Sequence, residues 1–209
     1  MALIFRPDLA DEHGLVAIGG DLRPNTLLRA YRNGIFPWFN EGDPVLWWSP
    51  DPRAIFEFDR FYLSRRLERT IRTGKFRLTI NQAFVDVMLG CADRDGTWIT
   101  TDMIAAYARM HELGFAHSIE VWLGNDLVGG IYGIAIGGFF SGESMFHRVS
   151  DASKVALAYL IEYVRIRGFT LFDTQVVTEH TASLGAILIP RELYLIRLAN
   201  ALELPATFV

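Results

Sequence analysis

The residues most suited to polar chemistry lie at the ends of two apolar segments in the second half of the chain. Asp173 and Gln175 stand two positions apart, so on a β-strand both side chains point to the same face of the sheet. Glu143 follows the other apolar segment, where an unpaired carboxylate would cost free energy. Glu143 therefore needs a cationic partner, which is either a salt bridge within the protein or a bound ammonium group.

A basic stretch between Arg60 and Arg77 is the second such feature. It holds seven of the chain's 20 Lys and Arg, and its one acid is Glu68. A serine N-cap, apolar residues at every fourth position and a terminal glycine predict a helix here. These signals are Ser64, Leu63, Leu67, Ile71 and Gly74. The opposite face of the helix carries Arg65, Arg69 and Arg72. Such a face either binds phosphate groups or is simply solvated.

Three further patterns are weaker. His111-Glu112 begins like a zinc-protease motif, but the next histidine, His117, is six residues on instead of four. Gly142–Phe146 resembles a nucleophile elbow but lacks its second glycine. His180 and Asp173 suggest a catalytic triad, although packing or capping of a short helix after His180 is the better interpretation.

The composition indicates a soluble globular protein. Of its 209 residues 51% are hydrophobic, and no apolar run reaches the about 18 residues that span a bilayer. The N-terminal segment, residues 1–11, lacks the apolar region of a signal peptide. Cys91 is the only cysteine, which excludes an intrachain disulfide. We therefore expect a cytoplasmic protein that is a monomer and does not bind membranes. The net charge of −4 leaves nucleic-acid binding to a local patch.

Turn residues and periodicity predict an α+β protein in two parts. The small, irregular N-terminal lobe covers residues 1–52 and has one helix over 26–33. The larger domain, residues 53–209, has helices over 102–113 and 152–167 and after Pro190. Its strands are predicted over 117–123, 127–136, 139–143 and 169–173. Three antiparallel strands, a helix and a returning strand are the core order of the acetyltransferase-like (GNAT) fold. The connection over 144–151 lacks the glycines of a pyrophosphate loop, which argues against coenzyme A.

Ten segments in register resemble the leucyl/phenylalanyl-tRNA–protein transferase family. They are GGDL (19–22), YRNGIFPWF (31–39), WWSPDPRA (47–54), GTWIT (96–100), HELGFAHSIEVW (111–122), LVGGIYG (127–133), FSGESMF (140–146), SK (153–154), DTQ (173–175) and HTASLGA (180–186). The resemblance implies an aminoacyltransferase that moves Leu or Phe, and also Met, from aminoacyl-tRNA to proteins with an N-terminal Arg or Lys. The added residue would mark the acceptor for N-degron proteolysis. The aminoacyl ester supplies the energy, so neither a cofactor nor a metal is expected.

The resemblance also implies roles for particular residues. Glu143 would face the α-ammonium of the aminoacyl group, and Asp173 and Gln175 would form the reaction centre. Our hypothesis is that Asp173 orients Gln175 and the incoming amine. The residues expected to line the substrate pocket are Trp38, Trp98, Ile131, Phe140, Ser144, Phe172 and Thr178. The residues expected to bind tRNA phosphates are Arg65, Arg66, Arg69, Arg72, Lys75 and Arg77.

Three other functions compete with this interpretation. A coenzyme A-dependent acyltransferase has the same fold but needs the missing phosphate loop. A non-catalytic RNA-binding module would need the basic helix but not Glu143, Asp173 and Gln175. A family member with an altered amino-acid preference is the third. Phe172 and Thr178 replace the aliphatic residue and the asparagine that some members carry around the DTQ motif.

Overall fold

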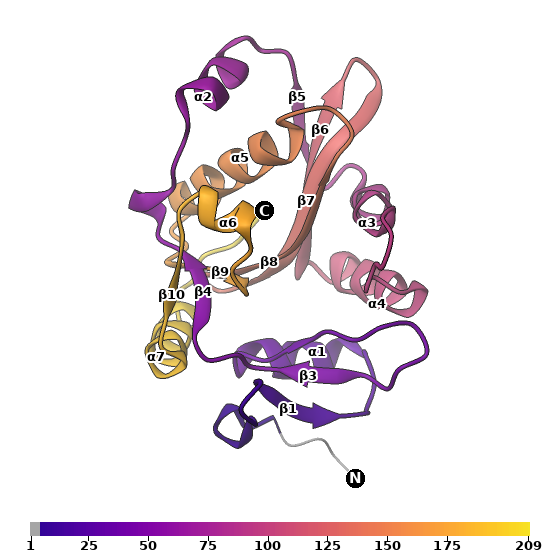
Figure 1. The fold of residues 1–209 in the computed structure, drawn as a ribbon, viewed down its shortest axis with the longest axis vertical. Helices are drawn as coiled ribbons and strands as arrows, with labels where there is room; N and C mark the ends of the chain where they lie inside the picture. Colours follow the sequence, from indigo (N-terminus) through magenta and orange to yellow (C-terminus); the bar gives the residue numbers. More distant parts are fainter. Residues whose placement is uncertain (1–4) are drawn as a thin grey trace.

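A computed structural model describes residues 5–209 (Figure 1). Residues 1–4 lie outside the described residues. They belong to the predicted N-terminal lobe and to the segment over 1–11 in which no signal peptide is expected. The predicted α+β class is confirmed: a large mixed sheet has helices on both faces, and a small sheet lies at the N-terminal end. Among the described residues, none of the helices combines the length and apolar character needed to cross a bilayer.

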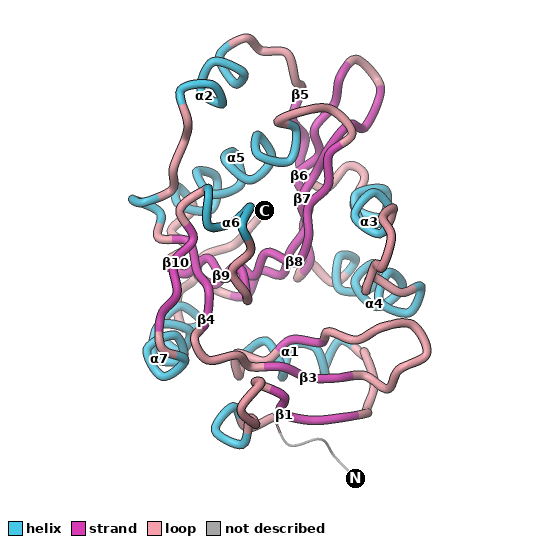
Figure 2. The backbone as a smooth tube through the Cα atoms, viewed as in Figure 1, coloured by secondary structure: helices cyan, strands magenta, loops and turns pink. Residues whose placement is uncertain are grey.

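The large sheet has seven strands in the order β10-β4-β9-β8-β7-β6-β5 (Figure 2). All neighbouring strands are antiparallel except β8 and β9, which are parallel. In chain order the strands are β4 (Arg53–Phe56), β5 (Arg77–Ile80), β6 (Ala116–Leu123), β7 (Asp126–Ile136), β8 (Phe139–His147), β9 (Leu171–Gln175) and β10 (Ala186–Ile189). The antiparallel set β6-β7-β8, the crossing helix α5 (Ala152–Ile166) and the return on β9 confirm the predicted acetyltransferase-like order.

Two of the predicted strand boundaries are wrong. The strand predicted to end at residue 143 continues to His147, because its last residues still pair with β7. Only residues 148–151 connect it to α5. The strand predicted over 169–173 is shifted to Leu171–Gln175. The first shift places Ser144 within a paired strand, and the second does the same for Gln175.

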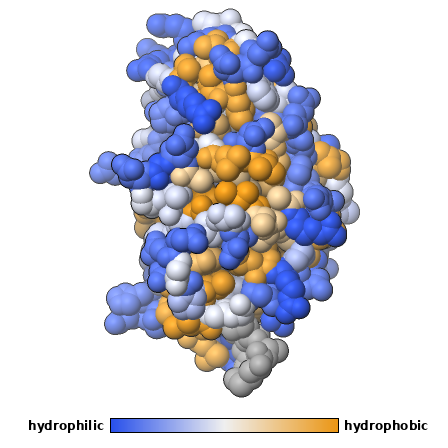
Figure 3. Space-filling model, turned by 90° about the vertical axis from the view of Figure 1, so that its right-hand side faces the viewer, coloured by the Kyte–Doolittle hydropathy of each residue, from blue (hydrophilic) through white to orange (hydrophobic). Residues whose placement is uncertain are grey.

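Helices cover both faces of the sheet (Figure 1). The predicted helices over 102–113, 152–167 and after Pro190 are confirmed as α4 (Thr101–Glu112), α5 and α7 (Arg191–Leu202). Helix α5 packs on one face, whereas α4 and α3 (Phe84–Ala92) pack on the other. Helix α3 was not predicted, and it buries Val87 and Met88 while Val85 and Leu89 remain at the surface. The face that carries α3 and α4 accordingly has apolar residues on its exterior (Figure 3).

The N-terminal part contains the small sheet β1-β3-β2 and one helix. Its elements are η1 (Pro7–Leu9), β1 (Leu15–Ile18), α1 (Pro24–Arg32), β2 (Phe36–Pro37) and β3 (Leu46–Trp48). Helix α1 confirms the helix predicted over 26–33. Tyr31 and Trp47 from this part share one apolar core with Tyr107 and Tyr132 from the larger part. The N-terminal part is therefore packed against the larger part through a common core.

The predicted basic helix is confirmed as α2 (Arg65–Arg72), with the Ser64 hydroxyl accepting a hydrogen bond from Leu67 N at 3.2 Å. Of its predicted apolar stripe only Leu67 is buried, because Leu63 and Ile71 are 37% and 42% exposed. Leu67 is therefore the one residue of α2 that is buried, and the helix packs beside α5. The remaining elements are η2 (Phe58–Arg60) and the short helix α6 (Glu179–Ser183).

Candidate active site

A cavity of about 500 Å³ opens where β8 and β9 meet the N-terminal part. Its walls are mostly apolar and come from β2, β4, β7, β8, β9 and α5. The apolar lining residues are Phe36, Pro37, Trp38, Phe56, Trp98, Ile131, Met145, Leu157, Phe172 and Val176. Trp38 is 45% exposed, so this ring stands at the opening. A cavity of this size and character suits a large apolar side chain.

Glu143 is the only carboxylate among the residues that line this cavity. Its Oε1 accepts hydrogen bonds from Ser141 Oγ at 2.9 Å and from Gln175 Nε2 at 3.0 Å. Burial raises the pKa of Glu143 to about 7, although hydrogen bonds from Tyr31, Gln175 and Ser141 oppose the rise. Within residues 5–209 no Lys or Arg forms an ion pair with Glu143. The carboxylate is therefore suited to a cationic group that enters the cavity.

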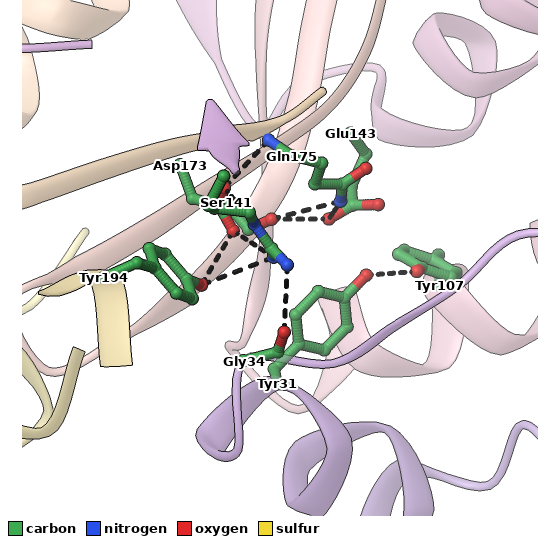
Figure 4. A network of polar contacts seen from close by, with 9 residues as sticks. Tyr31, Gly34, Tyr107, Ser141, Glu143, Asp173, Gln175 and Tyr194 are labelled. Carbon is green, nitrogen blue, oxygen red and sulfur yellow. Dashed lines mark hydrogen bonds and ion pairs between the residues drawn. The ribbon is translucent and has the colours of Figure 1, made fainter. Parts of the chain in front are cut away.

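Asp173 is fully buried and forms an ion pair with Arg53, within the polar network that Figure 4 shows. The guanidinium donates from Nε to Oδ1 at 2.9 Å and from Nη2 to Oδ2 at 2.6 Å. Tyr194 also donates to Oδ2, at 2.9 Å. Burial alone would lower the pKa of Arg53, but Asp173, Tyr194 and Glu143 together outweigh this effect and the pKa is raised. Asp173 is thus a neutralised structural anion that does not reach the cavity.

Gln175 connects these two carboxylates. Its backbone N–H donates to Asp173 Oδ1 at 2.8 Å, while its side-chain amide donates to Glu143. The two side chains have different surroundings, since Gln175 lines the cavity and Asp173 does not. The β-bulge at Thr174 interrupts the alternation on which the predicted shared face rests. Gln175 has φ 64°, a left-handed conformation that costs about 1–3 kcal/mol for a residue other than glycine. Because Asp173 accepts from the backbone at this point, it holds the strained residue in place.

The register of the sheet explains why these residues meet. Strands β8 and β9 run parallel with Ser141 beside Asp173. Glu143 and Gln175 each follow two residues later, beyond this last parallel pair and beside a β-bulge in each strand, and the hydrogen bond between them joins the two strand ends. Ser141 and Gln175 are also within hydrogen-bond distance, at 3.3 Å. The ends of these two strands therefore bring together Ser141, Glu143 and Gln175, which we call the polar floor.

The other predicted pocket residues have different positions. Trp98, Ile131, Ser144 and Phe172 line the cavity. Thr178 also lines it, and its hydroxyl caps α6 by accepting from Thr181 N at 3.1 Å. Phe140 lies behind the wall, with its ring centroid 5.2 Å from that of Phe172, and is not part of the lining.

Sequence reasoning missed Arg53, Tyr31 and Tyr107. Arg53 is 1% exposed and lies between the rings of Phe36 and Tyr194. The hydroxyls of Tyr31 and Tyr107 form a hydrogen bond in the buried region below Glu143 (Figure 4). Arg53 and Tyr31 belong to two of the motifs quoted above, but nothing in their local sequence indicates a buried polar partner 76 or 120 residues away.

The basic residues predicted to contact tRNA are all exposed. They are Arg65, Arg66, Arg69, Arg72, Lys75 and Arg77. Arg66 donates to Ser150 Oγ at 3.2 Å and to Asp151 Oδ2 at 3.3 Å, in the connection between β8 and α5. The basic helix is thereby tied to the segment that follows the strand of Glu143. Within the described part of the chain, no three His, Cys, Asp or Glu side chains gather as metal ligands would.

Comparisons with known proteins agree on one family. The family model described as leucyl/phenylalanyl-tRNA protein transferase matches residues 55–199, and the model of its N-terminal domain matches residues 20–51. The leucyl/phenylalanyl-tRNA–protein transferase of Enterobacter sp. (strain 638) is 56% identical over 204 residues, covering 96% of this chain and 87% of that protein. That of Anaeromyxobacter sp. (strain Fw109-5) is 53% identical, covering 95% and 87%.

Solved structures with a similar shape are more distant. FemX is 13% identical with a TM-score of 0.49, covering 80% of this chain and 66% of that one. A ribosomal-protein-alanine N-acetyltransferase from Brucella melitensis biovar Abortus 2308 is 12% identical with a TM-score of 0.38, covering 52% and 86%. Neither similarity bears on the chemistry of the site. The sequence relatives, which match nearly the whole chain at more than half identity, show that the chain belongs to the leucyl/phenylalanyl-tRNA–protein transferase family.

Proposed function

We propose that this protein transfers Leu or Phe, and also Met, from aminoacyl-tRNA to the N-terminal Arg or Lys of acceptor proteins. The observation that carries the proposal is the apolar cavity with one carboxylate, Glu143, in its lining. An amino acid esterified to tRNA has an apolar side chain and a free ammonium group close together. The cavity offers a complementary group to each.

The reaction needs one bond to form and one to break. The α-amine of the acceptor attacks the carbonyl carbon of the aminoacyl ester, and a C–N bond forms. The bond from that carbon to the ribose oxygen then breaks, and the released hydroxyl takes the proton that the amine loses. An α-amine has a pKa of about 7.7–8.0, so a useful fraction is already neutral near pH 7. Positioning can therefore supply much of the rate increase.

The side chains divide this work between binding and positioning. The ionised form of Glu143 pairs with the α-ammonium of the aminoacyl group, and this pairing lowers its pKa again. Gln175 directs its Nε2 to Glu143, so its amide oxygen has the capacity to accept a hydrogen bond from the incoming amine. Asp173 acts through Gln175, because its carboxylate is fully engaged by Arg53, Tyr194 and the Gln175 backbone. Asp173 is therefore a positioning residue, which modifies our expectation that it also orients the amine.

The remaining parts of the proposal concern the partners and the setting. The six basic residues of α2 and the segment after it bind tRNA phosphates without reading bases. A specificity difference of one methylene in an apolar pocket is only about 1–3 kcal/mol, which supports some acceptance of Met. The proposal also includes a lobe boundary near residue 52, a monomer in the cytoplasm, and acceptor proteins marked for N-degron proteolysis.

Transfer of labelled Phe from Phe-tRNA to a polypeptide that begins with Arg tests the proposal, without ATP or coenzyme A. We expect transfer by the wild type, none to the same polypeptide with an acetylated N-terminus, and strongly reduced transfer by Glu143→Ala and Gln175→Ala. The matched control is Glu162→Ala, which removes an exposed glutamate far from the cavity. Folded wild-type protein that binds tRNA but transfers no label would leave only an RNA-binding function.

A further inference from the structure

Two motifs remain without a role in this mechanism, namely Ser153-Lys154 and the histidine of HTASLGA, His180. Ser153 and His180 both line the cavity, although they are 27 positions apart in the sequence. His147 lines it on the same side, with its Nδ1 3.4 Å from Ser153 Oγ. Arg94, from the connection between α3 and α4, lines it as well. Basic side chains from three segments, Arg94, His147 and His180, therefore line one cavity.

We name Arg94, His147, Lys154 and His180 the rim cluster. All four are more exposed than Glu143, which is only 9% exposed, so they lie nearer the solvent than the polar floor does. Lys154 is close enough to His180 for its charge to act on the imidazole. Burial, together with Lys154 and His147, lowers the pKa of His180. The rim cluster is thus a set of basic side chains, of which Arg94 and Lys154 carry a positive charge.

Within residues 5–209 none of these four side chains forms an ion pair with an acid. Neither Lys154 nor Arg94 has a carboxylate oxygen within 4.0 Å. Asp151 lies nearby in the chain, but its carboxylate is engaged by Arg66 and Thr70. The chain as a whole has a net charge of −4, so positive charge is not a general feature of its surface. A local excess of positive charge at a cavity opening favours an anionic ligand.

The rim cluster also continues the basic face of α2. Arg66 contacts Ser150 and Asp151, only a few residues before Lys154, and α2 packs beside α5. The basic face of α2 and the rim cluster are therefore joined through the connection between β8 and α5. An aminoacyl group in the cavity would then leave its attached ribose and phosphate at the rim.

We propose that the rim cluster binds the phosphate on the 5′ side of the terminal adenosine of aminoacyl-tRNA, with Lys154 and His180 as its main ligands. This inference rests on the proposed function, since it assigns the part of the substrate next to the aminoacyl group. Every tRNA carries a phosphate at this position, so contact with it positions the ester without reading sequence.

Two ligands that differ by this phosphate alone test the inference. They are 3′-deoxy-3′-(phenylalanylamido)adenosine with a free 5′-hydroxyl and with a 5′-phosphate, whose amide link prevents transfer. We expect the phosphate to tighten binding to the wild type by about tenfold or more. The advantage should disappear in Lys154→Met, shrink in His180→Asn, persist in Lys154→Arg, and weaken as salt concentration rises. The matched control is Arg109→Met, at an exposed arginine of α4 that pairs with Glu112 and is not part of the cavity lining, and it should keep the full advantage.

Several results would overturn the inference. One is a wild type that binds the two ligands equally, and another is a Lys154→Met variant that keeps the full advantage. Equal weakening of both ligands in Lys154→Met would make Lys154 a structural residue of the pocket. Transfer from Phe-tRNA by the same wild-type sample separates the two levels. Transfer without a phosphate advantage removes only the rim site, whereas absence of transfer and of binding removes the proposed function as well.

Discussion

Replacement of the buried ion pair of Arg53 and Asp173 should separate the stability of this protein from its activity. Both side chains are at most 1% exposed and are joined by two hydrogen bonds of 2.9 and 2.6 Å. In Asp173→Leu the guanidinium stays buried without its counter-charge, and it cannot lose its proton to become neutral. Removing one partner of a buried pair costs about 3–5 kcal/mol, a large share of the roughly 5–15 kcal/mol that stabilises a typical domain.

The double variant Arg53→Met with Asp173→Leu should recover most of this loss. It removes both charges and fills the space with apolar atoms, a change that is often neutral in free energy. Arg53 also donates to Gly34 O at 2.9 Å, and that buried carbonyl would lose its donor. We therefore expect the double variant to remain about 1–3 kcal/mol less stable than the wild type.

Activity should not return with stability. Both variants remove Asp173 Oδ1, which accepts the hydrogen bond from the Gln175 backbone. A displacement of about 1 Å in a positioned group can cost about 100-fold in rate, so transfer should stay low in the double variant. Arg53→Met alone completes the cycle and should also be less stable than the double variant.

Urea unfolding and transfer of labelled Phe measure the two properties. In a protein of this size about 3–5 kcal/mol corresponds to a lowering of the melting temperature by roughly 6–20 °C. The control is Glu162→Gln, because Glu162 and Arg165 form an equally short two-bond pair at the surface. Such exposed pairs contribute about 0–1 kcal/mol. A double variant as unstable as Asp173→Leu would refute the charge argument, and one that regains transfer would refute the positioning role of Asp173.

Three further predictions concern the cavity. The pKa of Glu143 is raised from 4.5 to about 7, so the folded state holds a proton that the unfolded chain releases, and stability should fall as pH rises through this interval. Glu143→Gln should remove this dependence of stability on pH, raise the free energy of unfolding by about 3 kcal/mol at pH 8, and lose transfer. Urea unfolding at several pH values measures the effect, and the same pH dependence in the variant would contradict it. Tyr31→Phe removes a hydrogen bond that opposes the raised pKa of Glu143, so the acidic limb of the pH–rate profile should move to higher pH. Loss of the hydrogen bond between the Tyr31 and Tyr107 hydroxyls should cost about 0.5–1.5 kcal/mol. Trp38→Ala should change the free energy of unfolding by less than about 1 kcal/mol, because Trp38 is 45% exposed, yet it should raise KM for aminoacyl-tRNA. Trp47→Ala, at a fully buried ring, should lower the free energy of unfolding by about 3–5 kcal/mol. Similar shifts of the melting temperature in the two variants would be inconsistent with this division.

The elements with strong local signals could be predicted from the sequence. Helix α4 begins at a threonine N-cap, α2 at Ser64 and α7 after Pro190, and such caps act within one turn of the helix. The hairpin of β6 and β7 turns at a glycine with φ 61°, which a local pattern can also reveal. The short strands β4 and β10 were missed, because four residues contain too few alternations to separate a strand from a loop.

The sequence by itself determined five helices (α1, α2, α4, α5 and α7), the central hairpins, the family and the chemical types of the residues in the site. These depend on contacts within a turn or a strand, or on motifs that can be read in order. Only the tertiary structure decided how the polar groups are shared. Asp173 pairs with Arg53 across 120 positions and Glu143 bonds to Gln175 across 32, so one acid is buried in an ion pair and the other lines the cavity. No local pattern encodes that division, because the cost of burying a charge depends on which distant groups the fold brings beside it.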